Sequence, residues 1–233
     1  MHRLAPPNPL SPRSLFPSED FGAARREMVE KQLRCRGIAD ARVLAAMAAV
    51  PREEYVPPSL RARAYDDSPL PIGEEQTISQ PYIVAAMSAA LALKGSERVL
   101  EVGAGCGYQS AVLSRLAAEV IAVEFRSGLA RAAVERLERL GCRNVHVHCG
   151  DGTLGLPEFA PYHAILVAAA APAVPPPLFA QLAEGGRLIL PVGTTEEQEL
   201  RLVEKIEGQF RTCALDLCRF VPISGRYSWR PSP

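Results

Sequence analysis

The 233-residue chain lacks any excess of one charge, because its 26 lysines and arginines are matched by 26 aspartates and glutamates. Proteins that bind nucleic acid or anionic membranes through a charged surface normally carry a basic excess. Long apolar runs are also missing, since the longest, residues 164–171, is far shorter than the roughly 20 residues that a membrane-spanning helix needs. We therefore expect neither a nucleic-acid partner nor a membrane partner.

Spacings typical of cysteine-based sites are absent as well. No two of the six cysteines have the C-x-x-C spacing of a zinc knuckle or a thioredoxin-like redox motif, and the histidines suggest no metal set. The first residues lack the apolar segment of a secretory signal peptide. We expect free thiols in a reducing cytoplasm, although the even number of cysteines leaves disulfides as an alternative.

The N-terminal part of the chain has two different patterns. Residues 1–20 contain five prolines and no apolar periodicity, which predicts a disordered or extended segment outside the fold. Helical apolar spacing begins near Phe21, and a second helix is expected between Asp40 as its N-cap and Pro51. A third helix is expected after Ser79, whereas residues 57–73 are predicted to be irregular. Residues 21–95 are therefore expected to form a helical region packed on the core.

The rest of the chain alternates between strand and helix patterns. Strands are predicted at residues 98–102, 120–124, 145–149, 164–169 and 187–192, with helices between most of them. This alternation is typical of an α/β domain, in which helices cover both faces of a mostly parallel sheet. Two further runs around a turn at Glu207 and Gly208 predict an antiparallel pair at the C-terminal edge of the sheet. We place this core domain at residues 96–228.

A glycine-rich loop follows the first predicted strand of this domain. Its G-x-G-x-G sequence, residues 103–107, lets a ligand approach the backbone amides closely. Tyr108 stands where a dinucleotide-binding loop needs its third glycine, and no Lys-Ser/Thr pair follows, so the loop is not a P-loop. Glu124 ends the next strand, 19 residues after Gly105, where an acid can accept hydrogen bonds from both ribose hydroxyls of a nucleoside.

Two more carboxylates favour a particular nucleoside. Glu101 lies at the end of the strand before the loop, where it would repel a pyrophosphate but suit an ammonium or a sulfonium. Asp151, between Gly150 and Gly152, follows the third strand and could accept a hydrogen bond from an adenine amine. An ordinary turn is the alternative for this segment. Together these features favour S-adenosylmethionine over NAD or ATP.

Six segments resemble the protein-L-isoaspartate O-methyltransferase family, and the likeness extends over about residues 25–225. They are PLPIGEEQTISQP at residues 69–81, residues 99–107, GDG at 150–152, AAAP at 169–172, GGRLILPVG at 185–193 and RFVP at 219–222. The resemblance implies a Rossmann-like class I methyltransferase sheet with extra N-terminal helices, and it makes residues 21–95 the region that carries the substrate loop. It also implies S-adenosylmethionine-dependent protein-L-isoaspartate(D-aspartate) O-methyltransferase activity, without a metal.

The implied reaction methylates the free α-carboxylate of L-isoaspartyl residues in damaged proteins and peptides, and the ester then passes through a succinimide to L-aspartyl. A carboxylate has a pKa near 4, so no general base is required. This agrees with the absence of G-x-S-x-G, H-E-x-x-H and paired-carboxylate motifs. A dry site that aligns oxygen, methyl carbon and sulfur within about 3–3.5 Å should supply much of the acceleration.

The resemblance also implies roles for individual residues. Ser79 is the candidate catalytic residue, which would orient the carboxylate, although its place before Pro81 also suits a helix N-cap and the sequence alone favours the cap. The implied substrate-binding residues are Thr77, Ile78, Ser79 and Val221. The implied donor-binding residues are Thr77, Glu101, Gly103, Gly105, Gly107, Glu124, Asp151, Gly152 and Ser224, with a surface turn as the alternative for Ser224.

Two residues depart from the family pattern. His163 stands after Tyr162 where relatives usually have aspartate, and Cys106 replaces a serine of the glycine loop. If that aspartate only satisfies backbone donors, His163 can replace it; if it orders the acceptor loop, activity would fall or depend on pH. Two other functions therefore stay open: a methyltransferase for another carboxylate or hydroxyl, and a donor-binding module with impaired catalysis. We expect a cytoplasmic monomer whose partners are isoaspartyl-containing proteins and peptides.

Overall fold

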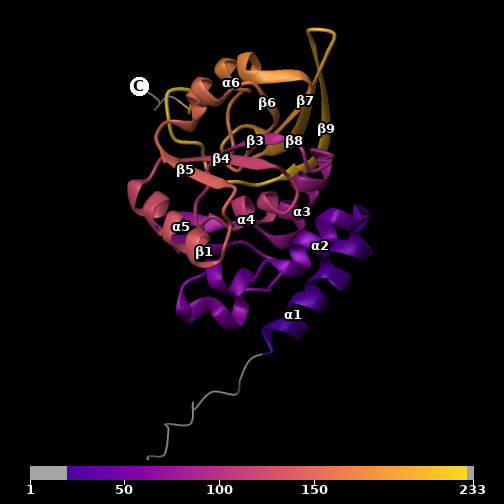
Figure 1. Ribbon diagram of the computed structural model, residues 1–233, viewed down its shortest axis with the longest axis vertical. Helices are drawn as coiled ribbons and strands as arrows, with labels where there is room; N and C mark the ends of the chain where they lie inside the picture. Colours follow the sequence, from indigo (N-terminus) through magenta and orange to yellow (C-terminus); the bar gives the residue numbers. More distant parts are fainter. Residues whose placement is uncertain (1–19, 230–233) are drawn as a thin grey trace, which may run out of the picture.

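The computed structural model describes residues 20–229, so the predicted extension at residues 1–20 lies outside the described residues except for Asp20. A seven-stranded sheet occupies one half of the molecule, and the N-terminal helices form a layer against it (Figure 1). The predicted α/β fold, with helices on both faces and extra helices at the N-terminus, is confirmed. None of the helices in residues 20–229 is both long and apolar enough to cross a bilayer.

The N-terminal layer begins with one continuous helical rod. Helix α1 (Phe21–Glu27) starts at Asp20, whose side chain accepts a hydrogen bond from the amide of Ala23. The rod continues as the π-helix η1 (Met28–Leu33) and the 3₁₀ turn η2 (Arg34–Arg36). The buried side chains of this rod, Met28, Val29 and Leu33, face the other helices of the layer.

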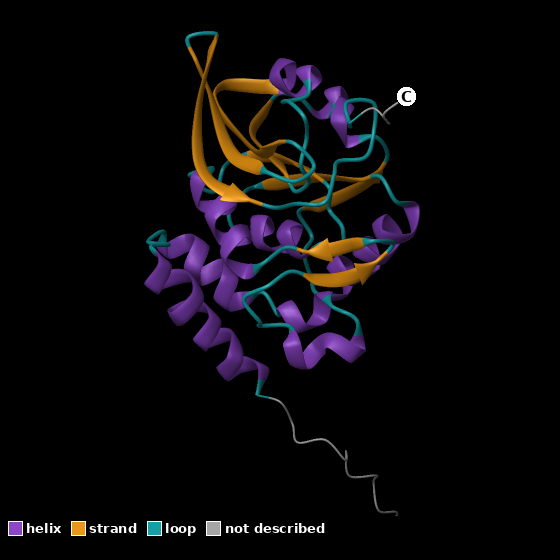
Figure 2. Ribbon diagram, turned by 180° about the vertical axis from the view of Figure 1, so that it is seen from behind, coloured by secondary structure: helices purple, strands orange, loops and turns teal. Residues whose placement is uncertain are grey.

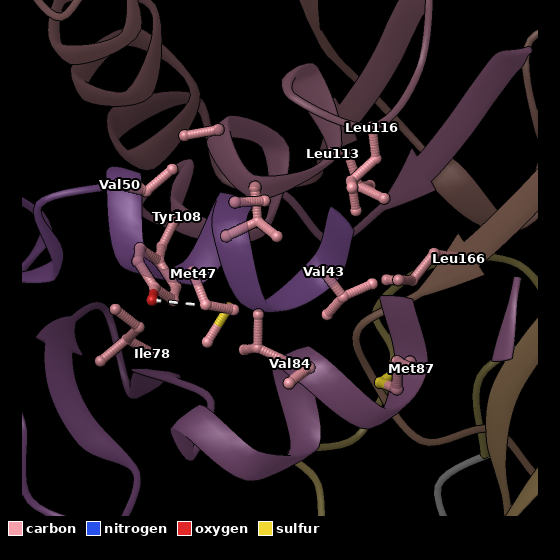
Figure 3. Packing of buried hydrophobic residues seen from close by; sticks show 14 of the residues in the cluster. Val43, Met47, Val50, Ile78, Val84, Met87, Tyr108, Leu113, Leu116 and Leu166 are labelled. Atoms are coloured by element: carbon pink, nitrogen blue, oxygen red, sulfur yellow. Dashed lines mark hydrogen bonds between the residues drawn. The ribbon is translucent and has the colours of Figure 1, made fainter. Parts of the chain in front are cut away.

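Helices α2 (Ala41–Ala49) and α3 (Pro81–Ala90) complete the layer. Asp40 caps α2 as predicted, because its carboxylate accepts hydrogen bonds from the first amides of the helix. Val43 and Met47 of α2 meet Val84 of α3, with Tyr108 beside them (Figure 3). The Tyr108 hydroxyl lies 3.8 Å from the Met47 sulfur. Burial of these side chains holds the layer on the sheet domain.

The prediction that residues 57–73 are irregular is wrong. The 3₁₀ helices η3 (Arg52–Tyr55) and η4 (Pro58–Arg63) are followed by a hairpin of strands β1 (Leu70–Gly73) and β2 (Gln76–Ile78). The hairpin stands apart from the large sheet (Figure 2). Glu74 and Glu75 form its turn with φ of 48° and 59°, a conformation that Asn-Gly pairs usually adopt, so the turn has no sequence signal.

The large sheet has the strand order β5-β4-β3-β6-β7-β8-β9. The parallel strands are β3 (Arg98–Val102), β4 (Glu119–Glu124), β5 (Val145–Cys149), β6 (Tyr162–Val167) and β7 (Leu182–Gly193). Strands β8 (Gln198–Ile206) and β9 (Gln209–Cys218) continue it antiparallel, as predicted. The strand order reverses beside β3, and ligands bind open α/β sheets at such a point, outside the carboxyl ends of the strands.

Helices cover both faces of this sheet. Helices α4 (Tyr108–Ser114) and α5 (Ser127–Arg139) lie on the face toward the N-terminal layer, and α6 (Pro176–Gln181) lies on the other (Figure 1). Alternate residues of β3 therefore enter different cores: Val99 packs with the N-terminal layer and Leu100 with the side of α6. The 3₁₀ turns η5 (Gly152–Leu154) and η6 (Pro157–Phe159) lie between β5 and β6.

Candidate active site

The glycine loop turns sharply between β3 and α4. Gly103, Gly105 and Gly107 all have positive φ, at 87°, 54° and 86°, which L-residues with a side chain adopt only at a cost. The amides of Gly103 and Ala104 donate to the carbonyl of Val123 and hold the loop over the end of β4. The loop held in this way leaves Gly103 and Gly105 on the lining of a cavity.

Gly107 faces a neighbouring helix in the structure, and its predicted approach to a donor stays a prediction. A Cβ at this position would lie 3.2 Å from the Leu137 side chain, so Gly107 faces helix α5. It is the N-cap of α4 and lies away from the cavity beside Gly103 and Gly105. The third glycine of the loop therefore also allows the helix to start there and to pack closely on α5.

A cavity at the carboxyl ends of β3, β4 and β6 collects most of the predicted donor-binding residues. We call it the donor cavity. The predicted residues that line it are Thr77, Gly103, Gly105, Glu124, Gly152, Val221 and Ser224. Sequence reasoning missed the other lining residues, of which Phe125 and Arg126 directly follow Glu124. Phe125 is 52% exposed, which is unusual for a large aromatic side chain. Only its place directly after Glu124 could have indicated a role at the cavity.

Glu124 is fixed at the rim of the donor cavity. Its Oε2 accepts from the amide of Gly105 at 2.7 Å, and its Oε1 accepts from the amide of Arg126 at 2.9 Å. Each carboxylate oxygen can accept more than one hydrogen bond, so lone pairs remain for a ligand. The arrangement suits a group with two neighbouring hydroxyls, as a ribose has.

Glu101 lies beneath the glycine loop and is fully buried. Its Oε2 accepts a hydrogen bond of 2.5 Å from the Ser110 hydroxyl, whereas its Oε1 has no partner within residues 20–229. Burial raises the pKa of Glu101 to about 8. The hydrogen bond from Ser110 lowers this pKa, and the nearby charge of Glu124 raises it further. A buried oxygen without a hydrogen-bond partner costs folding free energy. A cationic ligand group near this oxygen would stabilise the ionised form of Glu101.

Asp151 is already engaged by the protein. Its Oδ1 accepts from the amide and the hydroxyl of Thr153, at 2.9 and 2.6 Å, and its Oδ2 accepts from the amide of Arg226 at 2.8 Å. It caps the turn η5, so the ordinary-turn interpretation describes these bonds. The next residue, Gly152, lines the donor cavity, and a Cβ there would meet Val102 at 2.5 Å. The adenine contact of Asp151 stays a prediction.

A second hollow, of about 640 Å³, adjoins the donor cavity, and we call it the acceptor cleft. Thr77, Ser79 and Val221 line it, together with residues 217–220 from the end of β9. Thr77 and Val221 line both the donor cavity and the acceptor cleft, so the two hollows share a wall. Ile78 is buried instead and borders a small gap between β2 and the glycine loop.

The N-cap interpretation of Ser79 is wrong. The cap of α3 is Gln80, and Pro81 occupies its first turn, where the missing amide hydrogen is no loss. Ser79 is half-buried at the edge of the acceptor cleft, and its backbone carbonyl accepts a hydrogen bond of 2.8 Å from Arg52. Its hydroxyl therefore has no structural duty at the helix end, which leaves it available to the cleft.

The C-terminal segment closes both hollows. After β9 the chain returns to the end of β6, where the amide of Ala170 donates to Val221 at 2.9 Å and the amide of Ile223 donates to Ala170 at 2.7 Å. This short parallel pairing places Val221 on the shared wall and Ser224 at the donor cavity. Ser224 therefore lines the donor cavity directly before a turn, and its contact with the donor stays a prediction.

His163 lies far along the sheet from the site. It is at the start of β6, whereas both hollows lie at the carboxyl ends of the strands. Its Nδ1 accepts a hydrogen bond of 3.1 Å from the amide of Arg98, so it satisfies a backbone donor as a carboxylate could. Cys106 is buried, and burial raises the pKa of its thiol. The described residues contain no group of three His, Cys, Asp or Glu side chains placed to hold a metal.

Comparison of the sequence with known proteins finds one family along nearly the whole chain. The family described as Protein-L-isoaspartate(D-aspartate) O-methyltransferase (PCMT) matches residues 23–228. Protein-L-isoaspartate O-methyltransferase 2 of Marinobacter nauticus is 52% identical over 213 residues, which cover 91% of this chain and 97% of that protein. Protein-L-isoaspartate O-methyltransferase of Methanoculleus marisnigri is 52% identical over 206 residues, which cover 88% and 94%.

Solved structures give the same result. A protein-L-isoaspartate O-methyltransferase superposes with a TM-score of 0.78 at 34% identity, over 87% of this chain and 67% of that one. A Plasmodium falciparum structure described as a protein-L-isoaspartate O-methyltransferase, in complex with S-adenosyl-L-homocysteine, has a TM-score of 0.76 at 26% identity, over 86% and 98%.

Proposed function

Because this chain belongs to the protein-L-isoaspartate(D-aspartate) O-methyltransferase family, we propose that it repairs damaged proteins by methylating their L-isoaspartyl residues. S-adenosyl-L-methionine is the methyl donor, and the acceptor is the free α-carboxylate of the isoaspartyl residue. One observation carries the assignment to this site: the donor cavity and the acceptor cleft share a wall formed by Thr77 and Val221. Because the two hollows share these lining residues, a donor in one and an acceptor in the other would lie next to each other, as methyl transfer requires.

The reaction is one nucleophilic displacement. A carboxylate oxygen forms a bond to the methyl carbon as the bond between that carbon and sulfur breaks, and the electron pair of the broken bond stays on sulfur. The products are a neutral methyl ester and S-adenosyl-L-homocysteine, and no proton moves. Because both reactants lose charge, water stabilises them more than the transition state, so a site that excludes water favours transfer.

The residues that line the donor cavity and the buried Glu101 beneath the glycine loop fit this donor. The sulfonium supplies an activated methyl group, and the donor also carries an ammonium. The partnerless Oε1 of buried Glu101 suits these positive charges, and Glu124 suits the ribose hydroxyls. Gly103 and Gly105 leave room for close approach to the backbone. We assign Gly152 to the adenine of the donor and Ser224 to the rim of the cavity.

The hydroxyls of Thr77 and Ser79 are assigned to the acceptor carboxylate. A neutral hydroxyl orients a carboxylate oxygen without holding its charge as strongly as an arginine pair would, so the oxygen stays nucleophilic. Both residues line the acceptor cleft, and Thr77 also reaches the donor cavity. Val221 supplies an apolar part of the same lining.

The remaining proposals concern the whole protein. We assign it to the cytoplasm as a monomer that acts on isoaspartyl proteins and peptides, and not on nucleic acid or membranes. The balanced charge and the six unpaired cysteines support this assignment. We also retain the division into a substrate-loop region at residues 21–95 and a methyltransferase core at residues 96–228.

The test uses two synthetic peptides that differ only in an L-isoaspartyl or an L-aspartyl residue. With labelled S-adenosyl-L-methionine, we expect methyl transfer to the isoaspartyl peptide alone. Transfer to neither peptide, in a protein that still binds S-adenosyl-L-homocysteine, would contradict the repair function and favour a donor-binding module. Equal transfer to both peptides would contradict the specificity for isoaspartate.

A further inference from the structure

Arg52 is a fully buried arginine behind the reaction site, on the 3₁₀ helix η3 of the N-terminal layer. Its Nε donates to the carbonyl of Ala64 at 2.7 Å, and its Nη2 donates to the carbonyl of Ser79 at 2.8 Å. Its Nη1 is buried without a hydrogen-bond partner in the described part of the chain. Burying a guanidinium in this way costs folding free energy, which suggests that Arg52 at this position contributes to function.

The position of Arg52 connects the two halves of the site. On one side it holds the backbone of Ser79, which lines the acceptor cleft. On the other side its guanidinium carbon lies 4.9 Å from the ring centroid of Tyr108, the first residue of α4 after the glycine loop. Tyr108 and Ser79 border the same small gap between β2 and the glycine loop. One side chain therefore sets the spacing between the acceptor segment and the donor loop.

The charge of Arg52 is not neutralised by its surroundings. Within residues 20–229 it forms no salt bridge, and the groups that raise its pKa are Tyr108, Cys106 and Tyr65, which are neutral at pH 7. The neighbouring carboxylate, Glu53, forms a salt bridge with the Arg25 guanidinium at 2.8 Å and accepts a hydrogen bond from the Tyr65 hydroxyl. An arginine keeps its proton even when burial lowers its pKa, so a full positive charge remains behind Ser79.

We propose that Arg52 is a positioning residue of methyl transfer: its hydrogen bond to the Ser79 carbonyl fixes the acceptor segment, and its unpaired charge attracts the acceptor carboxylate. The inference rests on the proposed function, because it requires an anionic acceptor. The guanidinium acts from behind Ser79 and not by contact. It can therefore draw a carboxylate into the cleft without forming the strong ion pair that would weaken the nucleophile.

Two substitutions separate charge from position. In Arg52→Gln the charge is lost, and we expect the dissociation constant of an isoaspartyl peptide, measured with S-adenosyl-L-homocysteine bound, to rise about tenfold. In Arg52→Lys the charge remains, but an ammonium cannot reproduce the planar fork that reaches both carbonyls. This variant should bind the peptide within about twofold of the unmodified protein while kcat falls about tenfold. Affinity for S-adenosyl-L-homocysteine should stay unchanged in both variants.

Arg42→Gln is the matched control. Arg42 also donates to two backbone carbonyls, Leu93 at 2.6 Å and Leu116 at 3.0 Å, but it does so beyond the far end of α4. This variant should lower the melting temperature and leave peptide binding and kcat within about twofold. An Arg52→Gln variant that behaves like Arg42→Gln would overturn the inference.

If Arg52→Gln does not fold, Arg52→Lys alone decides the question. Native values of both kcat and peptide affinity in that variant, with only a lower melting temperature, would also overturn the inference. Failure of the proposed function is recognised separately, because the unmodified protein would then not methylate the isoaspartyl peptide in the same assay.

Discussion

At the scale of single residues, the site is arranged around two buried ionisable side chains, a carboxyl group and a guanidinium. Glu101 lies beneath the glycine loop on the donor side, and Arg52 lies behind Ser79 on the acceptor side. The donor is cationic and favours the ionised form of Glu101, whereas the acceptor is anionic and is drawn toward the guanidinium of Arg52 in our proposal. Each of the two side chains also has one hydrogen-bonding atom without a partner in the described residues. Both groups are costly to the protein alone, and ligands offset this cost.

Glu101 should make donor binding depend on pH. Its pKa is about 8 in the free protein, and a nearby cation favours the ionised form, so donor binding releases a proton. Affinity for S-adenosyl-L-methionine should therefore rise from pH 6 to about pH 8 and then level off. Calorimetry in buffers of different ionisation enthalpy measures the released proton. In Glu101→Gln we expect about tenfold weaker binding without this pH dependence, and an unchanged dependence would contradict the assignment.

The same residue should make the free protein less stable as pH rises. Its folded pKa of about 8 lies above the ordinary value of 4.5, so its favourable contribution is complete below pH 4.5 and is lost as pH rises through 8. Without donor, Glu101→Gln should thus raise the melting temperature more at pH 8 than at pH 5. Scanning calorimetry at the two pH values tests this. An equal change in melting temperature at both would show that the pKa of Glu101 does not lie between pH 5 and pH 8.

Ser79→Ala should separate catalysis from folding. Its hydroxyl caps no helix, so we expect kcat/KM for the isoaspartyl peptide to fall about 10- to 100-fold while the free energy of unfolding changes by less than about 0.5 kcal/mol. Ser114→Ala removes a hydroxyl that bonds only within α4, to the carbonyl of Ala111, and serves as the control with normal activity. A loss of stability in Ser79→Ala without a loss of activity would contradict the assignment.

The sequence allowed most of the donor cavity to be predicted, because its residues lie in motifs with distinct spacing. Gly103, Gly105 and Glu124 follow strand ends that the apolar pattern locates. The donor role of Gly107 stays a prediction, since a glycine that receives a ligand and one that faces a neighbouring helix, as Gly107 does, look alike in sequence. Arg52 could not be found, because its R-E-E segment has the composition of a solvated surface turn.

At the scale of elements, the strands of the parallel sheet were predictable and the N-terminal irregular segment was not. Strands β3, β4 and β6 are buried on both faces, so they appear as short apolar runs between turns. The hairpin of β1 and β2 contains a proline and a turn of two glutamates, both of which argue against strands in a sequence. Its form depends on packing against the layer and the glycine loop, which local patterns do not record.

The junction of β3 and α4 should be sensitive to a single methyl group. Gly107→Ala combines a positive φ of 86° with a contact at 3.2 Å to Leu137, and we expect it to lower the free energy of unfolding by about 2–3 kcal/mol. Gly141→Ala is the control, because its φ is 76° but nothing lies within 4 Å of the added carbon, and it should cost about 1 kcal/mol. Urea denaturation measures both, and equal losses would contradict the packing argument.

At the scale of the whole molecule, the site draws on distant parts of the chain. Thr77 comes from the N-terminal region, Gly103 and Glu124 from the core, and Val221 and Ser224 from the segment after the antiparallel strands. The six cysteines are also distributed through the fold, from the exposed helix end at Cys35 to the buried glycine loop at Cys106. Cys218 lines the acceptor cleft, and Cys106 stands between Gly105 and Gly107 of the glycine loop.

The reactivity of the thiols should report the burial seen in the fold. Cys35, Cys149 and Cys213 are exposed and should react quickly with a thiol reagent in the native protein. Cys218 should react slowly, because burial, with the charge of Asp216, raises its pKa to about 11. All six should react after unfolding without a reductant. A smaller number would reveal a disulfide and contradict the expectation of free thiols.

The return of the chain from β9 to the end of β6 has a consequence for biosynthesis. Residues 221–224 complete the walls of both hollows, and they are translated after every strand of the sheet. A nascent chain can therefore assemble its sheet before it can transfer a methyl group. A product of premature termination or proteolytic trimming before residue 221 should be inert, so an incomplete copy does not waste donor or esterify carboxylates at random.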